Sequence, residues 1–223
     1  RPPPTSTLLP YTTLFRSRLR ERCVAELLTH FPGSTVVVRS DSHMRGREGL
    51  EIRPEPHVRG ELSTPLQVTV DGVTLFTDAA RGQKTGLYLD QSANRPLMKP
   101  FCADARVLDL FCHVGWWSMC AARWGAREVI GVDSSGTALQ MARLAAQANG
   151  AACASFDEAD AFDWLADKKA RRGLFDVIVC DPPAFAKTRA HVPDALKAYL
   201  SLNYRAMKRS EEHTSELQSL SHL

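Results

Sequence analysis

The sequence has no stretch of about 18 consecutive apolar residues, the length that a membrane-spanning helix requires. It also lacks the positively charged segment followed by an apolar stretch that marks a secretory signal. Charge of neither sign dominates, because 28 Lys and Arg face 25 Asp and Glu, for a net charge of +3 in 223 residues. With 44% hydrophobic residues, this composition predicts an ordinary globular chain of one or two domains in the cytoplasm, with no membrane partner.

Two familiar cofactor and metal patterns are also missing. The six cysteines are scattered without a C-x-x-C pair, which argues against a zinc site or a disulfide framework and predicts that no metal is bound. There is no G-x-G-x-x-G triplet, which argues against NAD and FAD.

The two ends of the chain have neither helical nor strand periodicity. Residues 1–17 and 209–223 contain YTTLFRS and RSEEHTSELQS, which look like in-frame translations of the adapters used in short-read sequencing libraries. We therefore interpret both as non-native, adapter-like tails, with natural disordered tails as the alternative. On this interpretation the biological chain is a fragment that covers 18–208.

Residues 18–80 are predicted to form a small α+β lobe. A helix over 18–30 would bury Leu19, Cys23, Leu27 and Leu28, and a strand follows at 35–39. The polar stretch 40–63 is typical of an ordered loop or linker. Alternation in LQVTVDGVTLFTD, on either side of Asp71 and Gly72, predicts a β-hairpin.

From residue 106 onward, apolar strands alternate with helical stretches. This pattern predicts βαβ units and a parallel sheet, with function at the carboxyl ends of the strands. The expected strands are 107–111, 128–133, 153–156 and 176–181, and the expected helices are 116–124, 136–149, 162–169 and 193–207.

Acidic residues stand at three of the predicted strand ends. Asp109 opens a loop that reaches Gly115 and leads into a helix, whose free N–H groups could face a ligand. Asp133 could accept both hydroxyls of a ribose, or alternatively cap the next helix. Asp160 could hold an adenine amino group. Together they favour adenosine without a diphosphate.

The last predicted strand ends in Asp181-Pro182-Pro183-Ala184-Phe185. Two prolines make this loop rigid and present Asp181 as an acceptor beside an aromatic ring, an arrangement that suits a flat heteroaromatic carrying an amino group. A purely structural proline turn is the alternative.

The array VLDLFCHVG, VIGVD, EADAF and DPPAF resembles the class I S-adenosylmethionine-dependent methyltransferases, and their Rossmann-like α/β sheet is the fold we expect for 81–208. Two further segments, SDSHMRGREGLE and GQKTGLYLDQSANR, narrow the resemblance. With them, the sequence resembles the PUA-domain-bearing RNA methyltransferases that make 5-methylcytosine in large-subunit ribosomal RNA. The resemblance covers essentially all of 18–208. It implies S-adenosylmethionine as cofactor and RNA as partner.

The resemblance also implies roles for individual residues. Asp109 and Gly115 would form the methionine side of the cofactor pocket, Asp133 would hold the ribose, Asp160 would meet the adenine, and Gln91 would close over the cofactor with the segment before it. Asp181 is the expected catalytic residue, and the residues expected to bind substrate are Pro182, Phe185, Lys187 and Arg189. One departure from the family is Trp116, followed by Trp117, where a second small residue is usual.

The family's catalytic cysteine adds as a thiolate to carbon 6 of cytosine, and lies on the strand after the helix at 193–207. That strand and the PUA domain fall outside 18–208, so we expect this fragment to be inactive, with its C-terminal sheet strands missing. Cys180 is expected to point away from Asp181.

Two alternatives remain open: methylation of an exocyclic amino group, and a cofactor-binding relic whose pocket Trp116 blocks. Of the basic residues that could track phosphates, only Lys187 and Arg189 lie beside the proposed base pocket. The others are Arg39, Arg45, Arg47, Arg81 and Lys84.

Overall fold

The computed structural model describes residues 19–42, 44–47, 49–82, 86–167, 174–186 and 188–210. Within them the chain divides into two compact units, the first formed by residues up to Leu66 together with Asp78–Gly86, and the second by Gln67–Thr77 and the residues from Leu87 onward. The hairpin at 67–77 therefore groups with the second unit, whereas a domain boundary at residue 80 would put it in the first. Among the described residues, no helix combines the length and the apolar character needed to cross a bilayer.

The first unit is a helix beside a two-stranded antiparallel sheet. Its elements are α2 (Arg20–His30), β1 (Val36–Ser40), α3 (Met44–Arg47) and β2 (Arg53–Arg59), and β1 pairs with β2 from Val36 opposite Arg59 to Ser40 opposite Arg53. The expectation of an ordered loop or linker over 40–63 is therefore wrong, because β2 lies within it. It fails because a two-stranded sheet leaves the outer edge of β2 unpaired, where Pro54 and Pro56 need no ladder N–H.

The buried face of α2 also differs from the expected one. Val24 is the buried residue of this helix, whereas Cys23 is exposed and Leu27 is 45% exposed. A helix lying on only two strands buries a narrow row at four-residue spacing, here Arg20, Val24 and Leu28, of which the outer two are half-buried.

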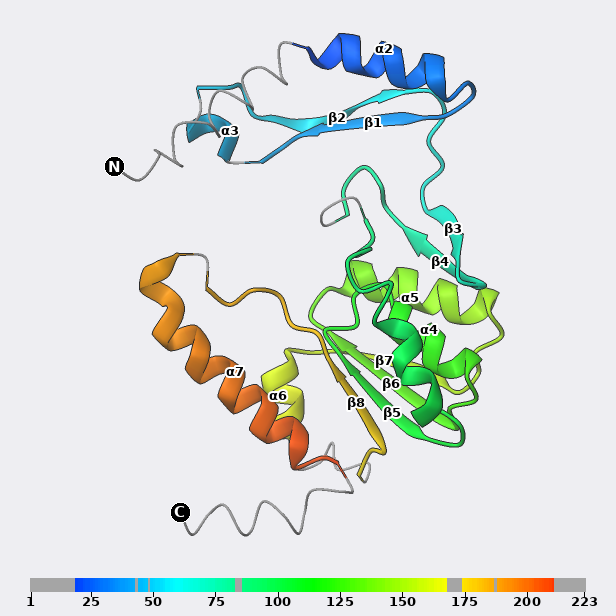
Figure 1. Ribbon diagram of the computed structural model, residues 1–223, viewed down its shortest axis with the longest axis vertical. Coiled ribbons are helices and arrows are strands. Elements are labelled where there is room, and N and C mark those ends of the chain that lie inside the picture. Colours follow the sequence, from blue (N-terminus) through cyan, green and yellow to red (C-terminus); the bar gives the residue numbers. More distant parts are fainter. Residues whose placement is uncertain are drawn as a thin grey trace. The chain divides into compact units, whose positions relative to one another are not determined.

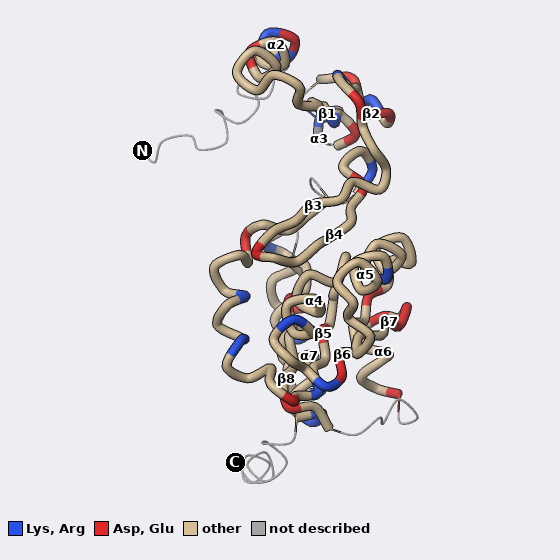
Figure 2. Tube along the Cα trace, turned by 90° about the vertical axis from the view of Figure 1, so that its right-hand side faces the viewer, with Lys and Arg blue, Asp and Glu red and all other residues tan. Residues whose placement is uncertain are grey.

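Five basic side chains of this first unit are paired with carboxylates, and Figure 2 shows the two charge types interleaved along α2 and the β1–β2 pair. The pairs are Arg20 and Arg59 with Glu21, Arg39 with Asp41, Arg53 with Glu51, and Arg81 with Glu55.

The second unit is built on a parallel four-stranded sheet with the strand order β7-β6-β5-β8 (Figure 1). The strands are β5 (Arg106–Leu110), β6 (Glu128–Asp133), β7 (Ala154–Glu158) and β8 (Val177–Cys180), and the helices between and after them are α4 (Trp116–Arg123), α5 (Gly136–Ala148), α6 (Ala161–Ala166) and α7 (Val192–Met207). Short 3₁₀ helices cover Arg95–Phe101 (η1) and Arg189–His191 (η2). A hairpin of β3 (Leu66–Val70) and β4 (Val73–Thr77) turns at Asp71 and Gly72, both with positive φ. The α/β Rossmann-like expectation is confirmed.

Strand alternation divides the core between the two faces of the sheet. Val107 and Val129 point into a cluster with α4, α5 and the hairpin, while Leu108 and Ile130 point into a second cluster with α6 and α7. The two helix pairs accordingly cover opposite faces of the sheet in Figure 1. Each strand therefore sends every second residue to the α4 side, and this alternation decides where its terminal carboxylate points.

One face of α7 carries a row of large apolar side chains that remain exposed. The helix buries Ala195, Leu202 and Ala206 toward the sheet. A second side of the helix presents residues at three- or four-residue spacing, namely Val192, Leu196, Leu200, Tyr204 and Met207, of which Leu200 is 72% exposed.

Candidate active site

Asp109, Asp133 and Asp181 lie at the carboxyl ends of three adjacent strands and share one side of the sheet: Asp109 is the last residue but one of β5, Asp133 is the last of β6, and Asp181 follows β8. In the parallel registers Asp109 pairs with Gly131 of β6 and with Val179 of β8, so the three carboxyl ends of β6, β5 and β8 lie next to one another. Burial is the main cause that raises the pKa of Asp109, and the negative charges of Asp181 and Asp133 raise it further, as expected for carboxylates that lie close together. The structure thus brings together three of the predicted site residues.

Asp109 is completely buried beneath the start of α4. Its Oδ2 accepts hydrogen bonds from the backbone N–H of Ser118 at 3.0 Å and from the Ser118 hydroxyl at 2.6 Å. Burial raises the pKa of Asp109 to about 7 despite these two bonds. Its Oδ1 has no hydrogen-bond partner among the described residues, which leaves one buried acceptor available to a donor that those residues do not supply.

The loop between β5 and α4 is held in a tight, strained path. Phe111, His113 and Gly115 all have positive φ, at 61°, 51° and 78°, although only the last is a glycine. A Cβ on Gly115 would lie 3.1 Å from the Cβ of Ala142 and 3.2 Å from the Phe156 ring. Gly115 is therefore required both by its backbone conformation and by the close approach of α5 and β7.

Asp133 fastens this loop to the end of β6. Its Oδ2 accepts the His113 backbone N–H at 2.9 Å, and its Oδ1 accepts the Ser135 N–H at 2.8 Å. The side chain that caps α5 is Ser135, which accepts from the Ala138 N–H, so Asp133 is not the helix cap that the sequence left as an alternative.

Asp160 is the N-cap of α6. Its exposed carboxylate accepts the backbone N–H groups of Phe162 at 2.8 Å and of Asp163 at 3.2 Å. It follows β7, whose last residue, Glu158, is the register partner of Asp133. Its predicted contact with an adenine remains a prediction.

Tyr88 and Gln91 lie on the segment before η1. The Tyr88 ring meets the His113 ring edge to face at 5.0 Å between centroids, which brings this segment to the β5–α4 loop. Burial and the carboxylates of Asp133, Asp90 and Asp181 raise the pKa of Tyr88, so its hydroxyl stays protonated. The half-buried Gln91 accepts a hydrogen bond from the Asn94 side chain at 2.7 Å through its Oε1.

Arg95 and the two tryptophans of α4 form a contact that sequence reasoning missed. Arg95 is 2% exposed, and its guanidinium carbon lies 3.5 Å from the Trp116 ring centroid and 5.6 Å from that of Trp117. It donates to the Tyr88 carbonyl at 2.8 Å and so ties the Tyr88 segment to the start of α4. The only hint in the sequence is an arginine at the end of GQKTGLYLDQSANR.

Trp116 itself is buried in the core cluster beneath the hairpin, with 4% of its surface exposed. Trp117 instead donates its indole N–H to Oδ2 of Asp181 at 3.3 Å. The two bulky rings after Gly115 are therefore used for packing and for a hydrogen bond to the Asp181 loop.

The Asp181–Phe185 loop is anchored by aromatic rings. Phe185 is half-buried and lies within 6.4 Å, between centroids, of Phe111, Phe162 and Tyr199, the last at 4.5 Å. Its backbone N–H donates to the Tyr199 hydroxyl at 3.4 Å. The ring thus sits in a cluster rather than on an open ledge, and its contact with a base remains a prediction.

The remaining predicted residues are placed only in part. Pro182 is half-buried beside Asp181, and Arg189 is exposed at the start of η2. Lys187 lies outside the described residues. Cys180 packs with the second core cluster, as strand alternation predicted, and is half-buried, with a pKa raised by burial to about 11.

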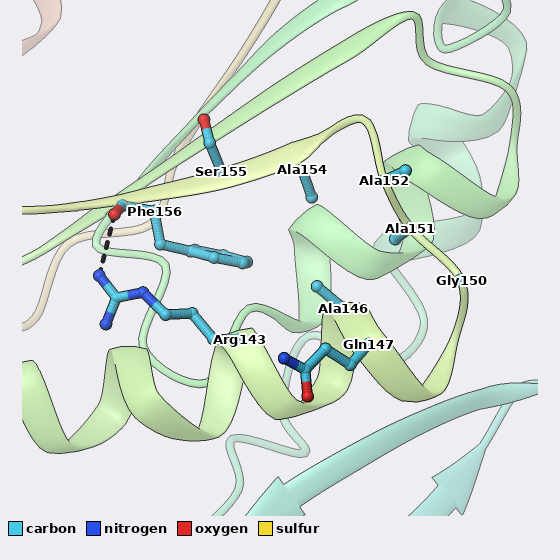
Figure 3. A pocket seen from close by; sticks show the side chains of 9 residues that line it. All are labelled: Arg143, Ala146, Gln147, Gly150, Ala151, Ala152, Ala154, Ser155 and Phe156. Carbon is cyan, nitrogen blue, oxygen red and sulfur yellow. Dashed lines mark hydrogen bonds between the residues drawn. The ribbon is translucent and has the colours of Figure 1, made fainter.

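A shallow hollow of about 560 Å³ lies elsewhere, between α5 and the edge strand β7 (Figure 3). Arg143 reaches along it and donates to the Phe156 carbonyl at 3.0 Å. None of the predicted site residues lines this hollow, which is walled mainly by alanine and glycine.

The residues at the strand ends fit S-adenosylmethionine. The unpaired Oδ1 of Asp109 suits an ammonium donor such as that of the methionine portion, the Gly115 turn leads into a helix N-terminus, and Asp133 ends the neighbouring strand where a ribose is held in Rossmann-like folds. Across the described parts of the chain, no group of three His, Cys, Asp or Glu side chains is arranged to hold a metal ion.

Comparison with solved structures supports the same fold. A protein provisionally described as a methyltransferase and crystallised with SAH superposes with a TM-score of 0.69 over 89% of this chain and 50% of its own, at 23% identity. A SAM-dependent methyltransferase from Agrobacterium tumefaciens gives a TM-score of 0.52 over 60% of this chain and 45% of its own, at 25% identity.

Comparison of sequences identifies closer relatives. The chain is 37% identical over 192 residues to the ribosomal RNA large subunit methyltransferase I of Aeromonas salmonicida, and 36% identical over the same length to that of Klebsiella pneumoniae. Each match covers 85% of this chain and 48% of the relative, so the chain spans about half the length of these proteins. The family model for S-adenosylmethionine-dependent methyltransferases matches residues 50–206. The chain therefore belongs to the S-adenosylmethionine-dependent methyltransferase family.

Proposed function

We propose that the complete protein containing this segment methylates RNA in the cytoplasm, at carbon 5 of a cytosine in large-subunit ribosomal RNA. The observation that carries the proposal is that Asp109, Asp133 and Asp181 lie together at the ends of three adjacent strands. They lie on the side of the sheet where the loop between β5 and α4 is found. The relatives named as ribosomal RNA large subunit methyltransferases support the RNA substrate.

In this proposal the chain's residues divide the work between two ligands. Asp109, Gly115 and Asp133 hold S-adenosylmethionine, whose methyl group is the one transferred, with Asp160 at the adenine and Gln91 over the cofactor. Asp181 accepts a hydrogen bond from the amino edge of the cytosine and stabilises charge that develops on the ring. The rigid Pro182-Pro183 turn keeps that acceptor in place, and Phe185, Lys187 and Arg189 complete the RNA side.

The two alternatives are less well supported. Methylation of an exocyclic amine by a D-P-P-aromatic loop needs the ring one position earlier than Phe185, and here that ring is packed against Tyr199 and Phe162. A relic blocked by Trp116 is disfavoured because the Trp116 ring is buried in the core under Arg95.

Cofactor binding is tested on the 223-residue chain by calorimetric titration with SAH. We expect measurable binding that Asp133→Ala weakens at least about tenfold, because it removes the acceptor proposed for the ribose and the tie to the His113 N–H. The matched control is Asp163→Ala on α6, with affinity unchanged. The same titration of the complete protein tests the relic alternative, which no detectable heat would favour.

The site of methylation is tested on the complete protein with unmethylated large-subunit rRNA labelled with tritium at carbon 5 of its cytosines. Methylation at carbon 5 replaces that hydrogen, so tritium appears in water in a 1:1 ratio with methyl groups incorporated. Methylation of the amino group leaves the carbon 5 label in the RNA. Methyl incorporation without tritium release would therefore replace the proposal with the exocyclic alternative.

A further inference from the structure

We propose that Trp117 is a positioning residue, whose indole N–H fixes the carboxylate of Asp181 so that its other oxygen faces the target base. This inference rests on the proposed function, because it assigns a role to a residue that acts through Asp181. Trp117 directly follows Trp116, the residue at which the sequence departs from the family that it resembles.

The geometry gives Asp181 a single side-chain partner within the described residues. Trp117 Nε1 donates to Asp181 Oδ2 at 3.3 Å, and no other hydrogen bond or ion pair reaches this carboxylate among the parts of the chain that the structure describes. The next two residues are prolines, which have no N–H to offer. The orientation of the Asp181 side chain therefore depends on Trp117.

The indole is itself held from two sides. Trp117 packs against the first core cluster as a partly buried ring, and the Arg95 guanidinium lies 5.6 Å from its centroid. Arg95 is anchored in turn by the Tyr88 carbonyl and by stacking on Trp116. Because the Trp117 side chain is already held in place, it loses little further conformational entropy when its N–H orients the Asp181 carboxylate.

The chemistry of an indole suits this task better than that of a cation. An indole N–H donates one hydrogen bond, carries no charge and accepts none, so it fixes Oδ2 while the carboxylate keeps its negative charge. A lysine or arginine in the same place would neutralise that charge. Oδ1 of Asp181 then stays a full acceptor for an amino group such as that of cytosine.

The bond can be observed on the 223-residue chain by NMR of ¹⁵N-labelled tryptophan indoles. The chain has four tryptophans, and Trp117→Phe identifies the resonance of Trp117. We expect Asp181→Asn to move that resonance and to speed its hydrogen exchange about fivefold, because the amide oxygen still accepts the indole N–H but the charge-assisted hydrogen bond becomes a weaker neutral one. Trp164 is the internal control, because its indole donates to Asp157 Oδ2 at 2.9 Å and should not respond.

Reciprocally, Asp157→Asn should move only the Trp164 resonance. A Trp117 resonance that ignores Asp181→Asn, or responds to it no more than Trp164 does, would overturn the proposal.

The role is tested by comparing SAH affinity with methyl transfer to rRNA by the complete protein. We expect Trp117→Phe to lower kcat about tenfold while the Kd for SAH stays within about twofold. The double variant Trp117→Phe/Asp181→Asn should be no slower than Asp181→Asn alone, because Trp117 acts only through the charged carboxylate that Asp181→Asn has already removed. Trp124→Phe, at the far end of α4, is the control with unchanged kcat.

The outcomes separate this inference from the proposed function. A wild-type protein that transfers no methyl group to RNA would refute the proposed function. If the wild type transfers methyl groups, three results would refute the role of Trp117 alone. Trp117→Phe could be as fast as the wild type, or it could weaken SAH affinity as much as it lowers kcat. The third result is that the effects of Trp117→Phe and Asp181→Asn on kcat add.

Discussion

Asp109 shows at the residue scale how a predicted site residue can be found where expected and yet behave differently. Strand periodicity places it correctly near the carboxyl end of β5, and the structure shows that it is completely buried on the α4 side. What the sequence could not reveal is that Ser118, nine positions on, would occupy one carboxylate oxygen and leave the other without a partner. That detail depends on how closely α4 approaches the strand.

The raised pKa of Asp109 predicts a specific pH dependence of stability. Because the folded pKa of about 7 lies above the ordinary value of 3.8, the folded state holds this proton more tightly than the unfolded state does. The contribution to the free energy of unfolding is thus full below about pH 4 and is lost as the pH rises toward 7. Asp109→Asn should abolish this decline, so that the stability of the variant relative to the wild type is about 4 kcal/mol greater at pH 8 than at pH 4.

Urea denaturation from pH 4 to pH 8 measures the effect, with Asp163→Asn on the surface of α6 as the control. Parallel pH curves for the wild type and Asp109→Asn would contradict the prediction.

Other contacts of the site were invisible in the sequence for a related reason. Phe111 and His113 adopt positive φ without being glycines, so the local sequence carried only one of the three left-handed positions, Gly115. Arg95 and Trp117 lie 22 residues apart in the chain, and their proximity follows from tertiary packing of η1 against α4. Residue type alone does not encode such a contact.

At the scale of elements, the parallel sheet was the most predictable part of the molecule. β6 occupies the predicted 128–133, and α4 and α5 each end one residue before the predicted position, because their apolar periodicity is uninterrupted and bounded by turn residues. The strand β2 was missed, since its two prolines and its charged residues are typical of loops. Pairing with β1 overrides that local preference.

The hairpin β3–β4 is joined to α5 by one asparagine. Asn149 accepts the Thr74 N–H at 2.9 Å and donates to the Thr74 carbonyl at 2.6 Å and to the Ala145 carbonyl at 2.7 Å. Asn149→Ala should lower the free energy of unfolding by about 1–2 kcal/mol and speed hydrogen exchange in β4, because the strand loses both bonds at its edge.

Denaturation and amide exchange measure these two effects, and Gln147→Ala, an exposed neighbour on α5, is the control. Unchanged exchange at Thr74 would show that the asparagine does not hold the hairpin.

At the scale of the whole molecule, the chain has two compact units, and all the site residues that the structure describes belong to the second. A ligand that binds only the folded second unit should therefore stabilise that unit alone. SAH at 100 times its Kd should contribute about 2.7 kcal/mol and raise the melting temperature of that unit by about 5–10 °C.

Differential scanning calorimetry with and without SAH checks this expectation. We expect the transition of the first unit to stay in place while the second moves, and Asp133→Ala should reduce the shift. Equal shifts in both transitions would mean that the units unfold together.

The apolar row along α7 affects how such melting experiments must be performed. Fluorescent dyes that report unfolding do so by binding exposed hydrocarbon, and Leu196 and Leu200 already offer it in the native fold. A dye-based thermal shift assay should therefore begin with a high signal at room temperature and give a blurred transition. Calorimetry or intrinsic tryptophan emission avoids that background.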